Sequence, residues 1–105
     1  MSVIMMLRAQ GDPKLLEQRA QANPEGMRAI IESAKEHGVI AHRFYGSDDG
    51  QIMVVDEWPD PESFQRFFKA TGSEIGPLMR EAGVTAEPEV TFWHKLDTGD
   101  EVGWD

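Results

Sequence analysis

Apolar residues recur along this chain with two periods, about 2 and about 3.6 residues, which are the periods of a strand and of a helix. The segment from Val3 to Gln10 begins with apolar residues at both odd and even positions, as expected for a strand that is covered on two faces. Residues 39–46 and 51–58 are β-branched and aromatic runs around Ser47-Asp48-Asp49-Gly50, which predicts a hairpin with Gly50 in the left-handed region. Residues 89–96 form the last expected strand.

Helical spacing fills the two long gaps between these strands. Each helical segment begins with a polar cap followed by proline, a pair that favours a helix start. Gly38 stops the first segment, and Gly76-Pro77 is expected to distort the second. The cap and proline pairs are Asp12-Pro13, Asn23-Pro24 and Asp60-Pro61.

The element order is therefore βα(α)ββα(α)β, which predicts an α+β, ferredoxin-like domain with a four-stranded antiparallel sheet. Because both crossovers return right-handed, the helices should cover one sheet face and leave the other open. The odd positions of the hairpin are assigned to the sheet of a second copy, so we predict a homodimer. The even positions are mostly apolar and are assigned to the helices: Ile40, Phe44, Ile52, Val54 and Trp58.

The length of 105 residues fits one domain, taken as residues 1–96, followed by an acidic tail, residues 97–105. Nineteen Asp and Glu against ten Lys and Arg give a formal charge of −9, which repels phosphate backbones and disfavours nucleic acid as a partner. The absence of cysteine excludes disulfides, thiolate metal sites and a cysteine nucleophile. With no leader or membrane-spanning stretch in sight, we predict a cytoplasmic protein that does not enter a membrane.

The run from Val54 to Phe64, VVDEWPDPESF, resembles the antibiotic-biosynthesis-monooxygenase type of dimeric α+β barrel. Members of that group carry an apolar strand ending in Glu-Trp, then an acidic cap, then a helix with an aromatic residue. The resemblance implies a dimer whose two sheets face each other, with a ligand pocket in each protomer between sheet and helices. The activities of the group include cofactor-independent oxygenation of polycyclic aromatics, haem degradation, isomerisation and cyclisation, and some members only bind ligands or respond to stress.

The haem-degrading branch of the group can be tested against individual residues, and three positions depart from it. Phe67 stands at the position of its helical Trp, the region of its proximal His reads Ile75 to Met79, and strand one has no Asn. Met79 follows the helical spacing of core residues, which favours packing over ligation. We therefore expect no cofactor.

Closure of the hairpin by a three-residue loop places His42 directly across from Asp56, with Cβ atoms about 5 Å apart. A carboxylate at that distance orients an imidazole and favours its protonated form, so the pair is suited to remove a proton from a phenolic substrate. The alternative is a structural pair in which the two side chains only satisfy one another. Both readings stay open at this level.

Other residues are expected to bind substrate around this pair. Phe44, Trp58 and Phe67 would form an aromatic wall, and Arg8 would reach in from a central strand one to hold an acidic group or Asp56. His94 is a further candidate for binding substrate, and the alternative is that it is a histidine of the surface or of an interface. No metal site is predicted, because the three histidines fall on separate elements without a ligand at i+4 or i+2: His37, His42 and His94.

Two functions remain. The first is an enzyme of the cofactor-independent monooxygenase or isomerase/cyclase type that acts on an apolar aromatic molecule, with His42 and Asp56 in acid–base roles. The second is a non-catalytic ligand-binding or stress-related dimer that uses the same pocket. A hollow cavity lined by the His–Asp pair would favour the first, and a cavity filled by aromatic side chains and Met79 would not.

Overall fold

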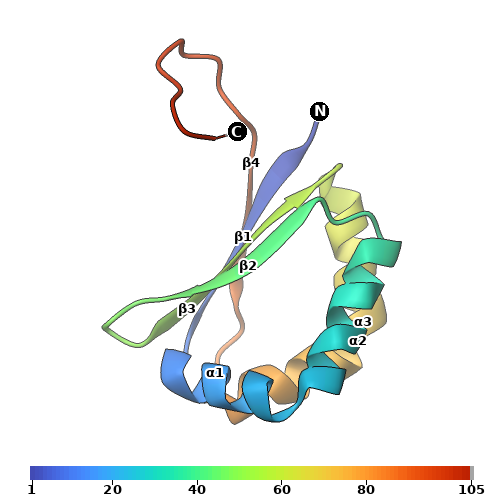
Figure 1. Ribbon diagram of the computed structural model, residues 1–105, viewed down its shortest axis with the longest axis vertical. Helices are drawn as coiled ribbons and strands as arrows, with labels where there is room; N and C mark the ends of the chain where they lie inside the picture. Colours follow the sequence, from blue (N-terminus) through green and yellow to red (C-terminus); the bar gives the residue numbers. More distant parts are fainter. Residues whose placement is uncertain (105) are drawn as a thin grey trace.

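The computed structural model describes residues 1–104; Asp105, the last residue of the expected acidic tail, lies outside the described part. Four strands and three helices follow one another in the order predicted (Figure 1). The strands are β1 (Val3–Gln10), β2 (Ala41–Gly46), β3 (Gln51–Trp58) and β4 (Glu89–Trp93). The helices are α1 (Pro13–Ala22), α2 (Pro24–Glu36) and α3 (Pro61–Glu81).

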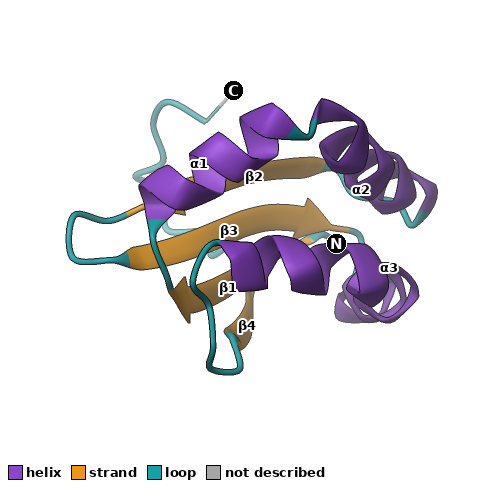
Figure 2. Ribbon diagram, turned by 90° about the horizontal axis from the view of Figure 1, so that it is seen from below, coloured by secondary structure: helices purple, strands orange, loops and turns teal. Residues whose placement is uncertain are grey.

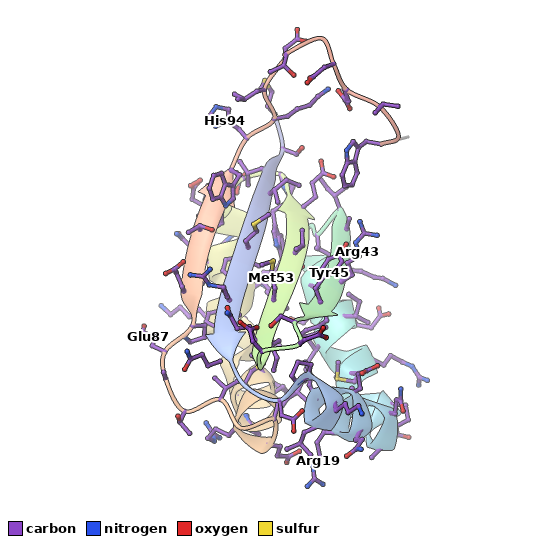
Figure 3. All side chains as sticks on the ribbon, turned by 90° about the vertical axis from the view of Figure 1, so that its left-hand side faces the viewer. Arg19, Arg43, Tyr45, Met53, Glu87 and His94 are labelled. Carbon is purple, nitrogen blue, oxygen red and sulfur yellow. The ribbon has the colours of Figure 1, made fainter. Side chains whose placement is uncertain are left out.

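The strands form one antiparallel sheet in the order β2-β3-β1-β4, so β1 lies between β3 and β4 as predicted. All three helices lie on one face of this sheet (Figures 1 and 2). The opposite face carries no helix and is seen directly in Figure 3. This confirms the α+β, ferredoxin-like architecture, and no helix within residues 1–104 is long and apolar enough to cross a membrane.

Polar caps begin the helices at the predicted positions. The Asp12 carboxylate accepts hydrogen bonds from the backbone N–H groups of Lys14 and Leu15. At the start of α3 the backbone N–H of Ser63 donates to the Asp60 carboxylate over 2.7 Å, and this bond lowers the pKa of that carboxyl. Proline follows each cap, where its missing N–H costs no helical hydrogen bond.

The β2–β3 hairpin is closed by a hydrogen bond of 2.9 Å from Ser47 N–H to the carbonyl of Gln51. Gly50 has φ +84°, a left-handed conformation that a residue with a Cβ rarely adopts. The resulting register pairs His42 with Asp56 and Phe44 with Val54, as predicted.

The core lies between the sheet and α3. Along β3 every second residue is buried, from Ile52 to Trp58, and the intervening residues are only half-buried on the helix-free face. Met5 in β1, together with Ile52 and Trp58, is among the largest fully buried side chains. Phe64 of α3 packs edge-on against Trp58, with ring centroids 5.8 Å apart.

Two local expectations were wrong. Ile40 is 56% exposed instead of facing the helices, because it precedes the first residue of an edge strand. The last strand ends at Trp93 and not at residue 96, and the tail extends beyond the sheet (Figure 1). Helix α3 is assigned without a break through Gly76-Pro77, and it is bent as expected, since its first and last parts run in different directions (Figures 1 and 2). Pro77 is tolerated there because Ser73, whose carbonyl loses its helical donor, lies on the exposed side of the helix.

Two isoleucines of the same chain allow a matched test of this core. Ile52→Ala should lower the free energy of unfolding by about 2–5 kcal/mol, since the removed atoms leave a cavity in a fully buried position. Ile40→Ala should lower it by less than about 0.5 kcal/mol, because that side chain is largely in water. Urea denaturation followed by circular dichroism measures both. Equal losses would contradict the placement of the core.

Candidate functional site

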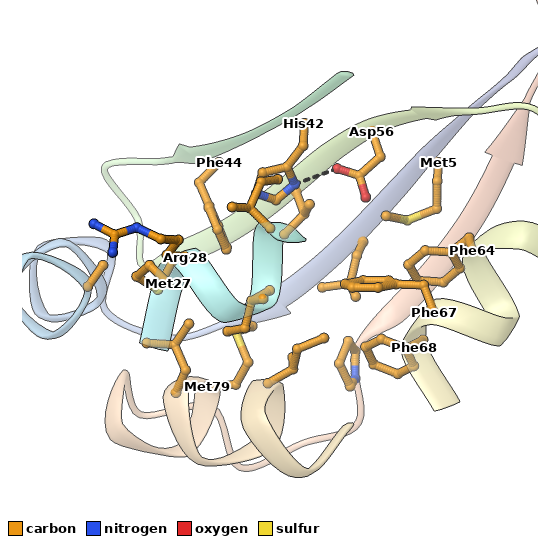
Figure 4. Close-up of a pocket in the computed structure, with 18 of the residues that line it drawn as sticks. Met5, Met27, Arg28, His42, Phe44, Asp56, Phe64, Phe67, Phe68 and Met79 are labelled. Atoms are coloured by element: carbon orange, nitrogen blue, oxygen red, sulfur yellow. Dashed lines mark hydrogen bonds and ion pairs between the residues drawn. The ribbon is translucent and has the colours of Figure 1, made fainter. Parts of the chain in front are cut away.

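A cavity of about 590 Å³ lies between the helical face of the sheet and the helices (Figure 4). Its strand side is formed by β1, β2 and β3, and its other side by α2, α3 and the end of α1. The cavity is hollow although it is lined by large apolar groups. Those on the sheet are Met5, Leu7, Phe44 and Val54, and those on the helices include Met27, Ile30, Ile31, Phe64, Phe67, Phe68 and Met79.

His42 and Asp56 both line this cavity and contact each other across the β2–β3 ladder. His42 Nδ1 lies 2.7 Å from Asp56 Oδ1, drawn as the dashed line in Figure 4. An ionised carboxylate only accepts hydrogen bonds, so Nδ1 carries the proton and donates it. In the neutral ring the other nitrogen, Nε2, is then the one without a proton. The contact predicted from the hairpin register is confirmed.

The second carboxylate oxygen of Asp56 is bound by Trp58. The indole Nε1–H donates to Asp56 Oδ2 over 3.0 Å. These residues are two apart on β3 and therefore share a face of the sheet. Only 4% of the Asp56 side chain is exposed, compared with 26% of the His42 side chain. A buried carboxylate is thus held by a core donor on one oxygen and by the imidazole on the other.

Trp58 consequently takes a different place from the one expected. It is fully buried and does not contribute to the cavity wall, where it was expected to contact substrate. The aromatic wall is made instead by other residues, among them Phe44 and Phe67 as predicted. Phe44 contacts the His42 ring edge-on at 5.3 Å between centroids, and Phe67 packs on Trp58 at 5.4 Å.

Arg8 lies on the wrong face of the sheet for the role expected of it. In β1 the buried residues Met5 and Leu7 point to the helices, so Arg8 points to the helix-free face. There its Nη2 lies 3.1 Å from Glu89 Oε1, and both side chains are more than half exposed. In β1 apolar residues occur at both odd and even positions, so the sequence did not show which of these positions face the helices.

His94 also lies away from the cavity. It follows the last residue of β4, is exposed, and stands where the chain leaves the sheet (Figure 3). The structure therefore brings together His42, Asp56, Phe44 and Phe67, and leaves Arg8 and His94 outside. Within residues 1–104 no group of three or more His, Asp or Glu side chains is placed to hold a metal ion.

Sequence reasoning missed Arg28, an exposed residue of α2 that lines the cavity. Its neighbour Met27 follows the apolar helical spacing and is assigned to the buried face of the helix. Arg28 does not follow that spacing, so the sequence assigns it to the solvent-exposed face. No pattern in the sequence distinguishes it from the other exposed arginines.

The fold is shared with several solved structures. A monooxygenase from the gene ActVA-Orf6 of Streptomyces coelicolor, in complex with the ligand nanaomycin D, superposes with a TM-score of 0.68 at 16% identity, covering 92% of this chain and 89% of that one. SnoaB, a cofactor-independent oxygenase from Streptomyces nogalater, gives 0.63 at 16% identity, covering 95% and 98%.

A dimeric ferredoxin-like protein from an uncultured marine organism gives a TM-score of 0.65 at 13% identity, covering 96% of this chain and 93% of that one. No protein-family model and no curated protein matches the chain. The structural likenesses show that the chain shares its fold with these oxygenases and with the dimeric ferredoxin-like protein, which agrees at the level of fold with the resemblance seen in the sequence.

The His42–Asp56 contact can be tested through the tautomer of the imidazole. Asp56→Asn should reduce the share of His42 that carries its proton on Nδ1, because an amide can donate to that nitrogen as well as accept from it. The ¹⁵N chemical shifts of the ring, measured at alkaline pH, report the tautomer. The variant should also lower the free energy of unfolding by about 1–3 kcal/mol through the weakened bond to Trp58.

Asp49→Asn is the matched control, because this carboxylate lies in the exposed hairpin loop with Ser47 as its partner. It should leave the His42 ring shifts unchanged. Unchanged shifts in Asp56→Asn as well would show that the two side chains do not meet.

Proposed function

We propose that this protein is a small-molecule enzyme in which His42 is the general base, acting on an apolar aromatic compound and working as a cofactor-independent monooxygenase or as an isomerase or cyclase. One observation carries the proposal. The imidazole, oriented by a buried carboxylate, stands on the wall of a hollow apolar cavity of about 590 Å³. That volume lies within the range of small-molecule sites. The lack of cysteine fits the cytoplasmic location that we infer.

The geometry suits removal of a proton from a phenolic or enolic hydroxyl. His42 Nε2 accepts the proton, and the imidazolium that forms is stabilised by Asp56 Oδ1 at 2.7 Å. Apolar surroundings strengthen this ion pair because little water screens it. Trp58 keeps the carboxylate in place from the core side, so the base does not have to reorganise during the transfer.

For an anthrone-type substrate the oxygenase reaction balances without a cofactor. Removal of the hydroxyl proton of the enol tautomer leaves a carbanion, whose electron pair reduces dioxygen as a C–O bond forms. The peroxide takes the proton back from the His42 imidazolium. Cleavage of the O–O bond with loss of the remaining C–H proton then leaves a ketone and one water, so one substrate consumes one dioxygen.

The structural neighbours support this class of reaction, since one is a cofactor-independent oxygenase and another a monooxygenase with nanaomycin D bound. Isomerisation and cyclisation would use the same base without dioxygen. The non-catalytic alternative would use the same cavity to bind an aromatic molecule without turnover.

The proposal is tested with anthrone as the substrate in an oxygen electrode. The protein should accelerate oxygen uptake over the uncatalysed rate, with one dioxygen consumed per anthrone. His42→Gln should lower the protein-dependent rate by about 10²- to 10⁴-fold, the usual contribution of a general base. His94→Gln is the matched control and should keep the full rate, because His94 lies outside the cavity.

The same samples separate the alternatives. Exchange of the anthrone methylene protons with D₂O, dependent on His42 but without oxygen uptake, would place the protein with the isomerases and cyclases. Saturable binding of anthrone with neither exchange nor uptake would leave the binding protein as the function.

We also infer that two copies pair through the helix-free face of the sheet. Apolar residues of this face are only half-buried in one chain, and Tyr45 and Trp93 are 47% and 55% exposed. Apolar patches of this kind rarely stay open to water. The half-buried residues are Ile4, Met6, Met53 and Val55. The ferredoxin-like neighbour is dimeric, which supports a dimer for this chain.

Multi-angle light scattering at micromolar concentration should give the mass of two chains. Val55→Glu, which adds a charge at the middle of the helix-free face, should shift the protein to the mass of one chain. Ala70→Glu adds the same charge on the exposed side of α3 and should leave the dimer intact. A wild-type monomer, or a dimer that survives Val55→Glu, would contradict the inferred interface.

A further inference from the structure

Three charged or titratable side chains line the cavity, and two of them are already paired with each other. The third is Arg28, which projects from α2 at the exposed side of the cavity. Figure 4 shows it beside Met27, with its guanidinium directed away from the His42–Asp56 pair. The cavity is therefore apolar along its length, with an acid–base pair on one part of its wall and a cation on another.

The guanidinium of Arg28 makes no hydrogen bond or ion pair within residues 1–104, although acidic residues occur on its own helix. Glu32, one turn further along α2, is engaged by Lys35 at 3.5 Å. Glu25, in the first turn, makes no ion pair with Arg28. Arg8, by contrast, has Glu89 at 3.1 Å. The guanidinium at the cavity is therefore not engaged by a carboxylate of the described chain.

We propose that Arg28 selects aromatic ligands that carry a carboxylate, by binding that group at the outer end of the cavity while the ring system occupies the apolar space. Guanidinium and carboxylate match as two parallel charge-assisted hydrogen bonds. The protein as a whole carries a charge of −9 and repels anions at long range. Affinity for an anionic ligand therefore needs a local cation, and Arg28 is the cation that lines the cavity.

The arrangement also orients the ligand, a step that rests on the proposed function of His42. A rigid aromatic molecule with a carboxylate at one end and a hydroxyl at the other is aligned when Arg28 holds the first group, because the hydroxyl then points along the cavity toward His42. Specificity follows from geometry, since apolar walls hold a ring system in any orientation, whereas two polar contacts at different places fix one. Arg28 acts here as a specificity-determining residue and takes no part in proton transfer.

Two probes of nearly equal shape separate charge from size: 6-hydroxy-2-naphthoic acid and 6-hydroxy-2-naphthamide. Their own fluorescence follows the titration. Wild type should bind the acid about 3- to 5-fold more tightly than the amide, the range expected for one partly exposed ion pair. The preference should shrink at about 0.5 M salt, where exposed charges are screened.

Arg28→Gln should remove the preference for the acid and leave binding of the amide unchanged. Arg19→Gln on the neighbouring helix α1 removes the same charge from an exposed residue that does not line the cavity, and it should keep the preference. His42→Gln should also keep it, because His42 contacts the other end of the ligand. Folding of each variant is checked by circular dichroism.

Equal binding of acid and amide by wild type would overturn the role of Arg28 and leave the cavity and its base untouched. A preference that survives Arg28→Gln, or that Arg19→Gln removes equally, would overturn it as well, because the effect would then come from the overall field. Binding of neither probe would overturn this inference, whereas the proposed function is decided by the anthrone assay. Selective binding of the acid by a protein that fails the anthrone assay would support Arg28 and refute the oxygenase.

Discussion

A carboxylate that is almost completely buried cannot stay without partners, and Asp56 has one for each oxygen. Both partners depend on the sheet. Trp58 shares its strand and its face, and His42 is its cross-strand neighbour only in the observed register. A slip by one residue would turn Phe44 away from the core at the same time as it separated the imidazole from the carboxylate. The apolar core and the polar pair therefore favour the same pairing of strands.

The second constraint is the space that the helices leave open. Large side chains from α2 and α3 line the cavity without closing it, and several of them remain only half-buried. Protein interiors are normally packed to the density of organic crystals, so an open apolar volume forgoes contacts that a filled core would make. The arrangement is understandable where a ligand supplies those contacts.

Much of the fold was predictable because short-range chemistry specifies it. Proline after a polar cap begins each helix, and Gly50 sets the hairpin, whose length brings His42 opposite Asp56. Other features depend on longer distances. The strand β1 is apolar on both parities, so nothing in its sequence shows that Arg8 faces away from the helices.

The features of the site that sequence reasoning missed also depend on how the elements pack together. The role of Trp58 as a donor to Asp56 depends on a rotamer inside the core, and the place of Arg28 depends on how far α2 stands from the sheet. Periodicity gives the face of a helix on which a residue lies, but it does not give the distance to the opposite wall. Cavity volume is for that reason a property of the assembled layers.

His42 and Asp56 differ in the strand that carries them. Asp56 belongs to β3, which has a neighbour on each side, whereas His42 belongs to β2 at the edge of the sheet. Edge elements open at lower free energy than central ones, through fluctuations that leave the rest of the molecule folded. Such breathing of β2 would bring the imidazole into contact with bulk water while the carboxylate remains in the dry interior. The imidazole thus has a route by which to exchange its proton with solvent, without any opening of the core that holds its partner.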